Sequence, residues 1–266
     1  MAIIFGPSGL GSVKESVSNL KEFSKLDIKA CEIAFTYGVY IKDEKDINVI
    51  REASEKYNIK LSIHAQYWLN LNSHDPKKIE ASKKRIIDCL KTGEKLGCYA
   101  VVIHPGYYGK MEKEETYQNI KSAILNLQNE IKINKWKIKL CIETMGKTNV
   151  FGSIDDIKKL VKETGCSFCL DFAHLKARSN GNMTYKEMVS EFSEFREWHC
   201  HFSGIVYGEK GEKHHIKTPK KELVELLEAL KPLKKSHDIT IINESPDPVK
   251  DSILSLKIWK EMDSKT

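Results

Sequence analysis

Short apolar runs alternate with longer amphipathic segments along the chain. Within the runs, hydrophobic residues occur at every second position or continuously, as in buried strands, whereas between the runs they recur three and four positions apart, as in helices. In the run 60–65, Leu61 and Ile63 alternate with Ser62 and His64, which predicts one apolar and one polar face. The predicted strands are 2–6, 30–35, 60–65, 100–105, 139–144, 167–172, 199–203 and 240–245.

The segments between these runs predict helices, several of which end at Gly or Asn just before the next strand. The clearest are 12–26, 46–58, 78–97, 118–131, 153–165 and 220–235. Alternation of strands and helices is typical of a parallel sheet. Eight such units in roughly 250 residues match the size of a (β/α)8 TIM barrel, so we expect one barrel domain over residues 1–266. A doubly wound open sheet is the alternative fold.

Six consecutive predicted strands end in a side chain that can bind a metal. These residues are His64, His104, Glu143, Asp171, His201 and Glu244. A polar residue at one strand end has a simple explanation, because strands run out into loops there. Six of them would converge on the carboxyl-terminal rim of a barrel, where carboxylates need cations to offset their repulsion. Histidine mixed with Asp and Glu suits Zn²⁺ or Mn²⁺ better than Ca²⁺, so a polynuclear metal site is favoured over a solvated acid/base pocket.

Further ligand types follow two of these strands. His174 lies three residues after Asp171, and Glu212, His214 and His215 lie in a glycine-containing loop after His201. One tetrahedral ion takes about four ligands, so this set predicts two or three ions that share bridging carboxylates. Ions clustered in this way are typical of enzymes that act on phosphodiesters.

The composition says more about the cellular compartment of the protein than about its function. With 41% hydrophobic residues the chain can bury a full core, and none of its apolar runs is long enough to cross a membrane. The start, MAIIFGPSGLG, is too short in its apolar part for a secretory signal. Seven cysteines, an odd number, predict reduced thiols and a cytoplasmic protein. The net charge of +6 permits a polyanionic partner without requiring one.

Several motifs together resemble the endonuclease IV family of apurinic/apyrimidinic endonucleases, within the xylose isomerase-like barrels. They occur in the family's order over nearly the whole chain: IHAQYWLNLNSHD, VIHPGYYGK, CIETMGK, CLDFAHLKA, HCHFS followed by EKHH, and INESPDP. The resemblance implies three zinc sites. The first would be held by His64, His104 and Glu143, the second by Glu143, Asp171, His201 and Glu244, and the third by His174, Glu212 and His214.

The resemblance also implies an activity, the hydrolysis of double-stranded DNA at the phosphodiester 5′ to an abasic site. The activity would require two to three Zn²⁺ ions, and Mn²⁺ could occupy one of the sites. Glu143 would be both a bridging ligand and the catalytic residue. Tyr67 matches the family's wedge-like tyrosine, and loop positions suggest DNA contacts for Tyr107, Lys42 and Lys110. We expect a monomer.

Departures from the family's pattern indicate a divergent, short member. Glu212 stands where the family prefers aspartate, and FGPSGLG replaces the polar opening of the first strand. Histidines outside the family's match, namely His74, His199, His215 and His237, are predicted to be surface, supporting or core residues. The CxxC pair Cys166 and Cys169 is predicted to pack in the interior.

Two other functions stay open at this point. A metal-dependent sugar isomerase or epimerase could use the same barrel with fewer ligands, which would leave the third set without a purpose. A non-catalytic DNA-binding module would need the lysines but not the converging metal ligands.

Overall fold

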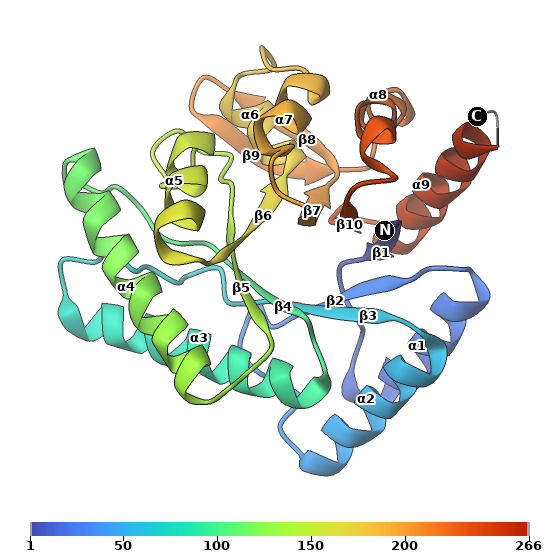
Figure 1. Ribbon diagram of the computed structural model, residues 1–266, viewed down its shortest axis with the longest axis horizontal. Coiled ribbons are helices and arrows are strands. Elements are labelled where there is room, and N and C mark those ends of the chain that lie inside the picture. The colour runs from blue at the N-terminus through green and yellow to red at the C-terminus, as the bar shows by residue number, and fades with distance from the viewer. Residues whose placement is uncertain (1, 265–266) are drawn as a thin grey trace.

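The computed structural model describes residues 2–264, so the first residue and the last two of the predicted domain lie outside it. Eight parallel strands form a barrel that is surrounded by helices (Figure 1). The strands are β1 (Ile3–Pro7), β2 (Ala30–Ala34), β3 (Lys60–His64), β4 (Ala100–Ile103), β5 (Lys139–Glu143), β6 (Ser167–Asp171), β7 (Glu197–Phe202) and β10 (Asp238–Asn243). Their order, β1-β10-β7-β6-β5-β4-β3-β2, confirms the predicted TIM barrel and is not that of a doubly wound sheet.

The barrel closes between its first two strands at a close backbone approach. Lys29 donates its backbone N–H to Phe5 over 3.2 Å, and Gly9 donates to Glu32 over 2.8 Å. Between these contacts, a Cβ atom on Gly6 would lie 1.9 Å from the carbonyl oxygen of Ala30. The seam between β1 and β2 therefore requires glycine at position 6.

The helices cover the outside of the barrel (Figure 1). They are α1 (Val13–Lys25), α2 (Glu44–Tyr57), α3 (Pro76–Leu96), α4 (Lys113–Ile133), α5 (Ile154–Thr164), α6 (Phe172–Arg178), α7 (Tyr185–Phe192), α8 (Lys220–Leu230) and α9 (Pro248–Asp263). Left-handed residues Asn58, Gly97 and Gly165 end α2, α3 and α5, as the sequence predicts. The helix predicted to run to residue 235 ends at Leu230, since Pro232 removes a backbone donor, and a short 3₁₀ turn follows.

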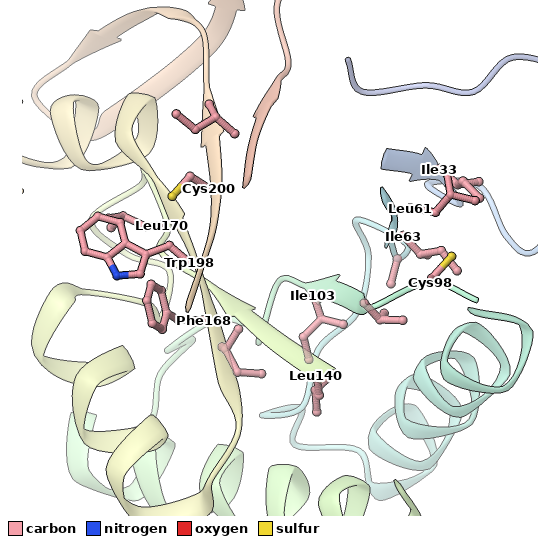
Figure 2. Packing of buried hydrophobic residues seen from close by; sticks show 14 of the residues in the cluster. Ile33, Leu61, Ile63, Cys98, Ile103, Leu140, Phe168, Leu170, Trp198 and Cys200 are labelled. Atoms are coloured by element: carbon pink, nitrogen blue, oxygen red, sulfur yellow. The ribbon is translucent and has the colours of Figure 1, made fainter. Parts of the chain in front are cut away.

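Alternation along the strands separates two buried layers. Leu61, Ile63, Phe168 and Trp198 lie in the large cluster between strands and helices, part of which Figure 2 shows. The small residues Ala100, Val102, Cys141 and Cys169 form a separate cluster on the opposite faces of β4, β5 and β6, which face the barrel interior. Small apolar side chains therefore fill this part of the barrel interior, and polar side chains occupy the rest of it.

The segment after β7 departs from the sequence prediction of a loop. It forms an antiparallel hairpin of β8 (Gly204–Gly208) and β9 (Gly211–Ile216), and both strands contact α6. Val206 pairs with His214 and Tyr207 pairs with Glu212, so Lys213 is the extra residue of a β-bulge. The hairpin is joined to the β5–α5 loop by a bridge between Lys147 and Gly211.

All seven cysteines are buried and unpaired, as predicted. Among the described residues no helix combines the length and the hydrophobicity that crossing a membrane requires.

Candidate metal centre

The strand-end residues converge as predicted, and Glu143 is at the centre of the cluster. Its Oε2 atom lies 2.8 Å from Nε2 of His104 and 3.2 Å from Nε2 of His64. Its Oε1 atom lies 3.2 Å from Nδ1 of His201 and 3.3 Å from Nδ1 of His174. One buried carboxylate at the end of β5 therefore contacts four imidazoles that come from β3, β4, β7 and α6.

Two groups of possible ligands share Glu143. The first joins it with His64 and His104, and the second joins it with Asp171, His201 and Glu244, with the donor atoms of each group within 4.8 Å of one another. Glu244 is the most peripheral of these, its Oε2 atom lying 3.5 Å from Nδ1 of His201. Both groups consist of the residues that the resemblance to the endonuclease IV family implies for the first two metal sites.

The third predicted group needs a correction. His174 Nε2 lies 3.5 Å from Oε2 of Glu212, but the histidine that completes the group is His215, while His214 is exposed. In a regular strand, residues 212 and 214 would share a face. The bulge at Lys213 shifts this alternation by one residue, so that Glu212 and His215 face the cluster.

Hydrogen bonds orient several of these histidines through Nδ1. Nδ1 of His64 donates to the backbone oxygen of Ala65 over 2.7 Å, and Nδ1 of His174 lies 2.9 Å from that of Thr144. His215 Nδ1 donates to Oγ of Ser203 over 2.7 Å, because the Ser203 hydroxyl itself donates to Gly204. Nε2 of each ring is thereby left for the cluster, as in histidines that bind metals.

The charge balance of the site calls for cations. Burial opposes ionisation, yet the Glu143 carboxylate holds the pKa of His64 at about 9, and the surrounding carboxylates hold those of His174 and His201 well above the usual range. Without metal, protons on the imidazoles thus supply the positive charge that the carboxylates require.

The environment of Asp171 is an independent indication that the site would bind a cation. Its Oδ2 atom is buried and has no hydrogen-bond partner, and burial raises the pKa of this carboxyl. A buried carboxylate oxygen without a donor is costly, whereas a divalent cation beside it would satisfy the oxygen. The mixed nitrogen and oxygen donors, shared between groups through Glu143, fit Zn²⁺ or Mn²⁺.

The cluster opens into a cavity of 480 Å³ at the rim of the barrel. Tyr67 and Tyr107 line it with about half of their surface exposed, and Lys147 lies on the same wall. The other two predicted DNA contacts lie elsewhere. Lys42 lines a separate groove between α2 and α3, and Lys110 is an exposed residue of the β4–α4 loop.

Sequence reasoning missed two features of the site: Glu32, and the place of His215 in the third group. Glu32 is fully buried in the middle of β2 and contacts both His199 and His201. A carboxylate inside the apolar run ACEIA was the available signal, since Glu is rarely buried without a partner. His74 is exposed, and His237 is bonded to Ser193 far from the centre, as predicted.

Comparison with known proteins gives the same superfamily. Residues 20–261 match the xylose isomerase-like TIM barrel family. An uncharacterised protein of Methanocaldococcus jannaschii is 35% identical over 273 residues, covering 98% of both chains. An apurinic-apyrimidinic endonuclease of Caenorhabditis elegans is 30% identical over 171 residues, which cover 58% of this chain and 42% of that protein.

Two solved structures share the fold over nearly their whole length. Endonuclease IV from Thermus thermophilus superposes with a TM-score of 0.75 at 17% identity, covering 99% of this chain and 100% of that one. A D-tagatose 3-epimerase-like protein superposes with a TM-score of 0.70 at 22% identity, covering 98% and 97%. The chain therefore belongs to the xylose isomerase-like TIM barrel family, as a divergent member that has endonuclease 4 proteins among its relatives.

Proposed function

We propose that the protein is a metal-dependent AP endonuclease that hydrolyses double-stranded DNA at the phosphodiester 5′ to abasic sites, with two to three Zn²⁺ or Mn²⁺ ions as cofactors. The observation that carries the proposal is the third ligand group of His174, Glu212 and His215, beside two groups that already share Glu143. Isomerisation of a sugar needs one or two ions to polarise a carbonyl. A third group is useful where a phosphate and a departing oxygen both carry charge.

Some of the proposed ligands are buried and would hold the ions in place, whereas others face the cavity and are accessible from it. Divalent ions bound in such a site would activate a water molecule and neutralise the phosphate. Glu143, fully buried between four imidazoles, would fix the spacing of the first two ions. His104 and Glu212 are each 17% exposed and face the cavity, so they mark the side from which a phosphodiester would approach.

The rim offers the contacts that an abasic nucleotide would need. Tyr67 packs on His64 and His104, with ring centroids 5.1 and 5.4 Å away, and its ring borders the cavity. A ring held there would stack against bases next to the lesion or fill the gap that the missing base leaves. Tyr107 and Lys147 on the cavity wall would contact the sugar and a phosphate, with Lys42 and Lys110 limited to DNA farther from the lesion.

A sugar epimerase is the second candidate, and the cavity itself favours it. Its 480 Å³ is within the range of sites for small molecules, and the D-tagatose 3-epimerase-like protein shares the fold. The two functions differ in substrate and in the number of ions required, so one preparation can be tested for both.

The decisive experiment is incubation of the zinc- or manganese-loaded protein with an end-labelled duplex that contains one abasic site. We expect a single nick 5′ to the lesion that leaves a 3′-hydroxyl, which a DNA polymerase can extend. The undamaged duplex is the substrate control, and Glu143→Gln is the enzyme control. This variant should reduce nicking by several orders of magnitude, because it alters a shared ligand and leaves the apolar face of β5 intact.

The same protein is then incubated with D-tagatose and D-fructose, and the sugars are separated by chromatography. An uncut abasic duplex with both metals would rule out the endonuclease. Conversion of either sugar into its C3 epimer under those conditions would establish the epimerase instead.

A further inference from the structure

Beneath the proposed metal ligands, a buried hydrogen-bond chain crosses the barrel interior from β2 to β7. Glu32, on β2, accepts from Ser62 over 2.9 Å and lies 2.9 Å from the Nε2 atoms of both His199 and His201. His199 Nδ1 is bonded to the hydroxyl of Tyr99. Nothing in the proposed chemistry uses Glu32, although burying a carboxylate in a barrel is costly without a compensating role.

The donors of this chain follow from the carboxylate, which can only accept. His199 Nε2 lies 2.9 Å from Oε2 of Glu32. This ring therefore carries a hydrogen on Nε2 and donates it to Glu32. Nε2 of His201 lies 2.9 Å from the other carboxylate oxygen of Glu32, Oε1, which is buried and has no hydrogen-bond partner in the structure. A carboxylate oxygen can only accept, so a hydrogen on Nε2 of His201 would satisfy it.

His201 differs in orientation from two other histidines of the centre. His64 and His215 turn Nε2 toward the ligand groups and bond Nδ1 to a backbone or serine oxygen. His201 faces Glu143 and Glu244 with Nδ1, at 3.2 and 3.5 Å, and so would need its hydrogen on the opposite nitrogen when Nδ1 binds an ion. A carboxylate below the ring would hold it there.

We propose that Glu32 is a positioning residue of the metal centre, which takes the Nε2 hydrogen of His201 and thereby leaves the Nδ1 lone pair, on the side of Glu143 and Glu244, available for a metal ion. The negative charge of Glu32 also makes His201 a stronger ligand. Tyr99 and His199 complete the arrangement, since they turn a donor toward Glu32 instead of toward His201. The inference rests on the proposed metal centre but not on DNA as the substrate.

An ion within the chain is the competing explanation. Cys169 Sγ and one nitrogen each of His199 and His201 lie within 4.8 Å of one another, which is compatible with a further cation. Both ring nitrogens of His199 are already bonded, one to Tyr99 and the other to Glu32, which leaves neither of them for an ion. We therefore favour positioning.

The test is zinc affinity, measured by competition with a chromophoric chelator on metal-free protein that has been reloaded. Glu32→Gln keeps the shape of the side chain and removes its charge, so the affinity for one zinc ion should fall by about 10–100-fold. Ser62→Ala is the matched control, because it removes a bond to the same carboxylate but leaves its charge and its contact with His201. Its affinity should stay near that of the parent. If Glu32→Gln does not fold, Glu32→Asp is the alternative variant. It retains the charge but places it farther from His201, so the affinity for the same zinc ion should fall.

Long-range ¹H–¹⁵N spectra of the zinc-loaded protein report the tautomer directly. We expect a protonated Nε2 on His201 in the parent and in Ser62→Ala, and loss or a shift of that signal in Glu32→Gln. Unchanged affinity and spectra in the glutamate variants would overturn the inference while leaving the proposed function standing. Loss of one zinc in Cys169→Ser would overturn it in favour of an ion at this cluster. A parent that binds no zinc would overturn both proposals.

Discussion

Glu212 and His215 face the same ligand group from one strand although three positions separate them. Side chains of a regular strand repeat every two residues, so this relationship exists only because Lys213 forms a bulge opposite Val206 and Tyr207. It moves His214, the histidine at the family-like spacing, to the exposed face. The bulge therefore decides which residues of the hairpin belong to the third group, and the sequence of the hairpin does not reveal its position.

His215→Ala should therefore lower the number of bound zinc ions per chain by about one, and His214→Ala should leave the number unchanged. The first variant removes a nitrogen that Ser203 orients toward the group, whereas the second removes an exposed side chain. Elemental analysis of both variants after dialysis against equal free zinc measures this. The reverse pattern, with His214→Ala losing the ion, would show that β9 has a different register in the loaded protein.

Removal of metal should destabilise the barrel. The converging carboxylates and imidazoles would bind ions in the folded chain only, so we expect the protein to purify with more than one Zn²⁺ or Mn²⁺ per chain. At a free ion concentration one hundred times the dissociation constant, one ion adds about 2.7 kcal/mol of stability. Chelator treatment should therefore lower the unfolding temperature by roughly 5 °C or more.

Differential scanning calorimetry before and after chelation, followed by zinc addition, checks this prediction. Recovery of the original unfolding temperature is expected. A chelated protein that unfolds at the same temperature as the untreated one would contradict a structural contribution from bound ions.

The barrel was predictable from the sequence because its signals are local. Alternation in runs such as 60–65, glycine or asparagine at helix ends, and eight repeats of one unit all report the fold without knowledge of distant contacts. The strand-end ligands were predictable for the same reason, since barrel topology alone brings His64 and Glu244 to one rim.

The remaining parts of the site depend on contacts between distant segments. Glu32 acquires its role only when β2 and β7 face each other across the interior, 167 residues apart for its bond with His199. The bulge at Lys213 depends on pairing within a hairpin that docks on the β5–α5 loop. Neither contact leaves a periodic pattern in the chain.

Tyr67→Ala should weaken binding of an abasic duplex more than that of an undamaged one, because the ring at the cavity mouth would stack only where a base is missing. We expect a loss of about 1–3 kcal/mol in affinity for the abasic duplex, as for other base–aromatic contacts. Fluorescence anisotropy with both duplexes measures it. Tyr37→Ala is the control, because that tyrosine is exposed but does not line the cavity. Equal losses in the two variants would remove Tyr67 from the proposed interface.

Gly6→Ala should destabilise the barrel at its seam. The added Cβ would lie 1.9 Å from the carbonyl oxygen of Ala30, so β1 and β2 would have to separate where few backbone hydrogen bonds join them. Overpacking of this kind costs about 1–3 kcal/mol, more where a rigid backbone atom is the obstacle. Urea unfolding should show a lower midpoint with an unchanged dependence on denaturant.

Gly208→Ala is the control for the general effect of replacing glycine in a strand. Its added Cβ would meet only the end of the Lys213 side chain, which can move. Its midpoint should stay close to that of the parent, since no backbone atom is displaced. If Gly6→Ala unfolded at the same urea concentration as Gly208→Ala, β1 and β2 would not approach as closely as described, and the barrel would be open at this seam.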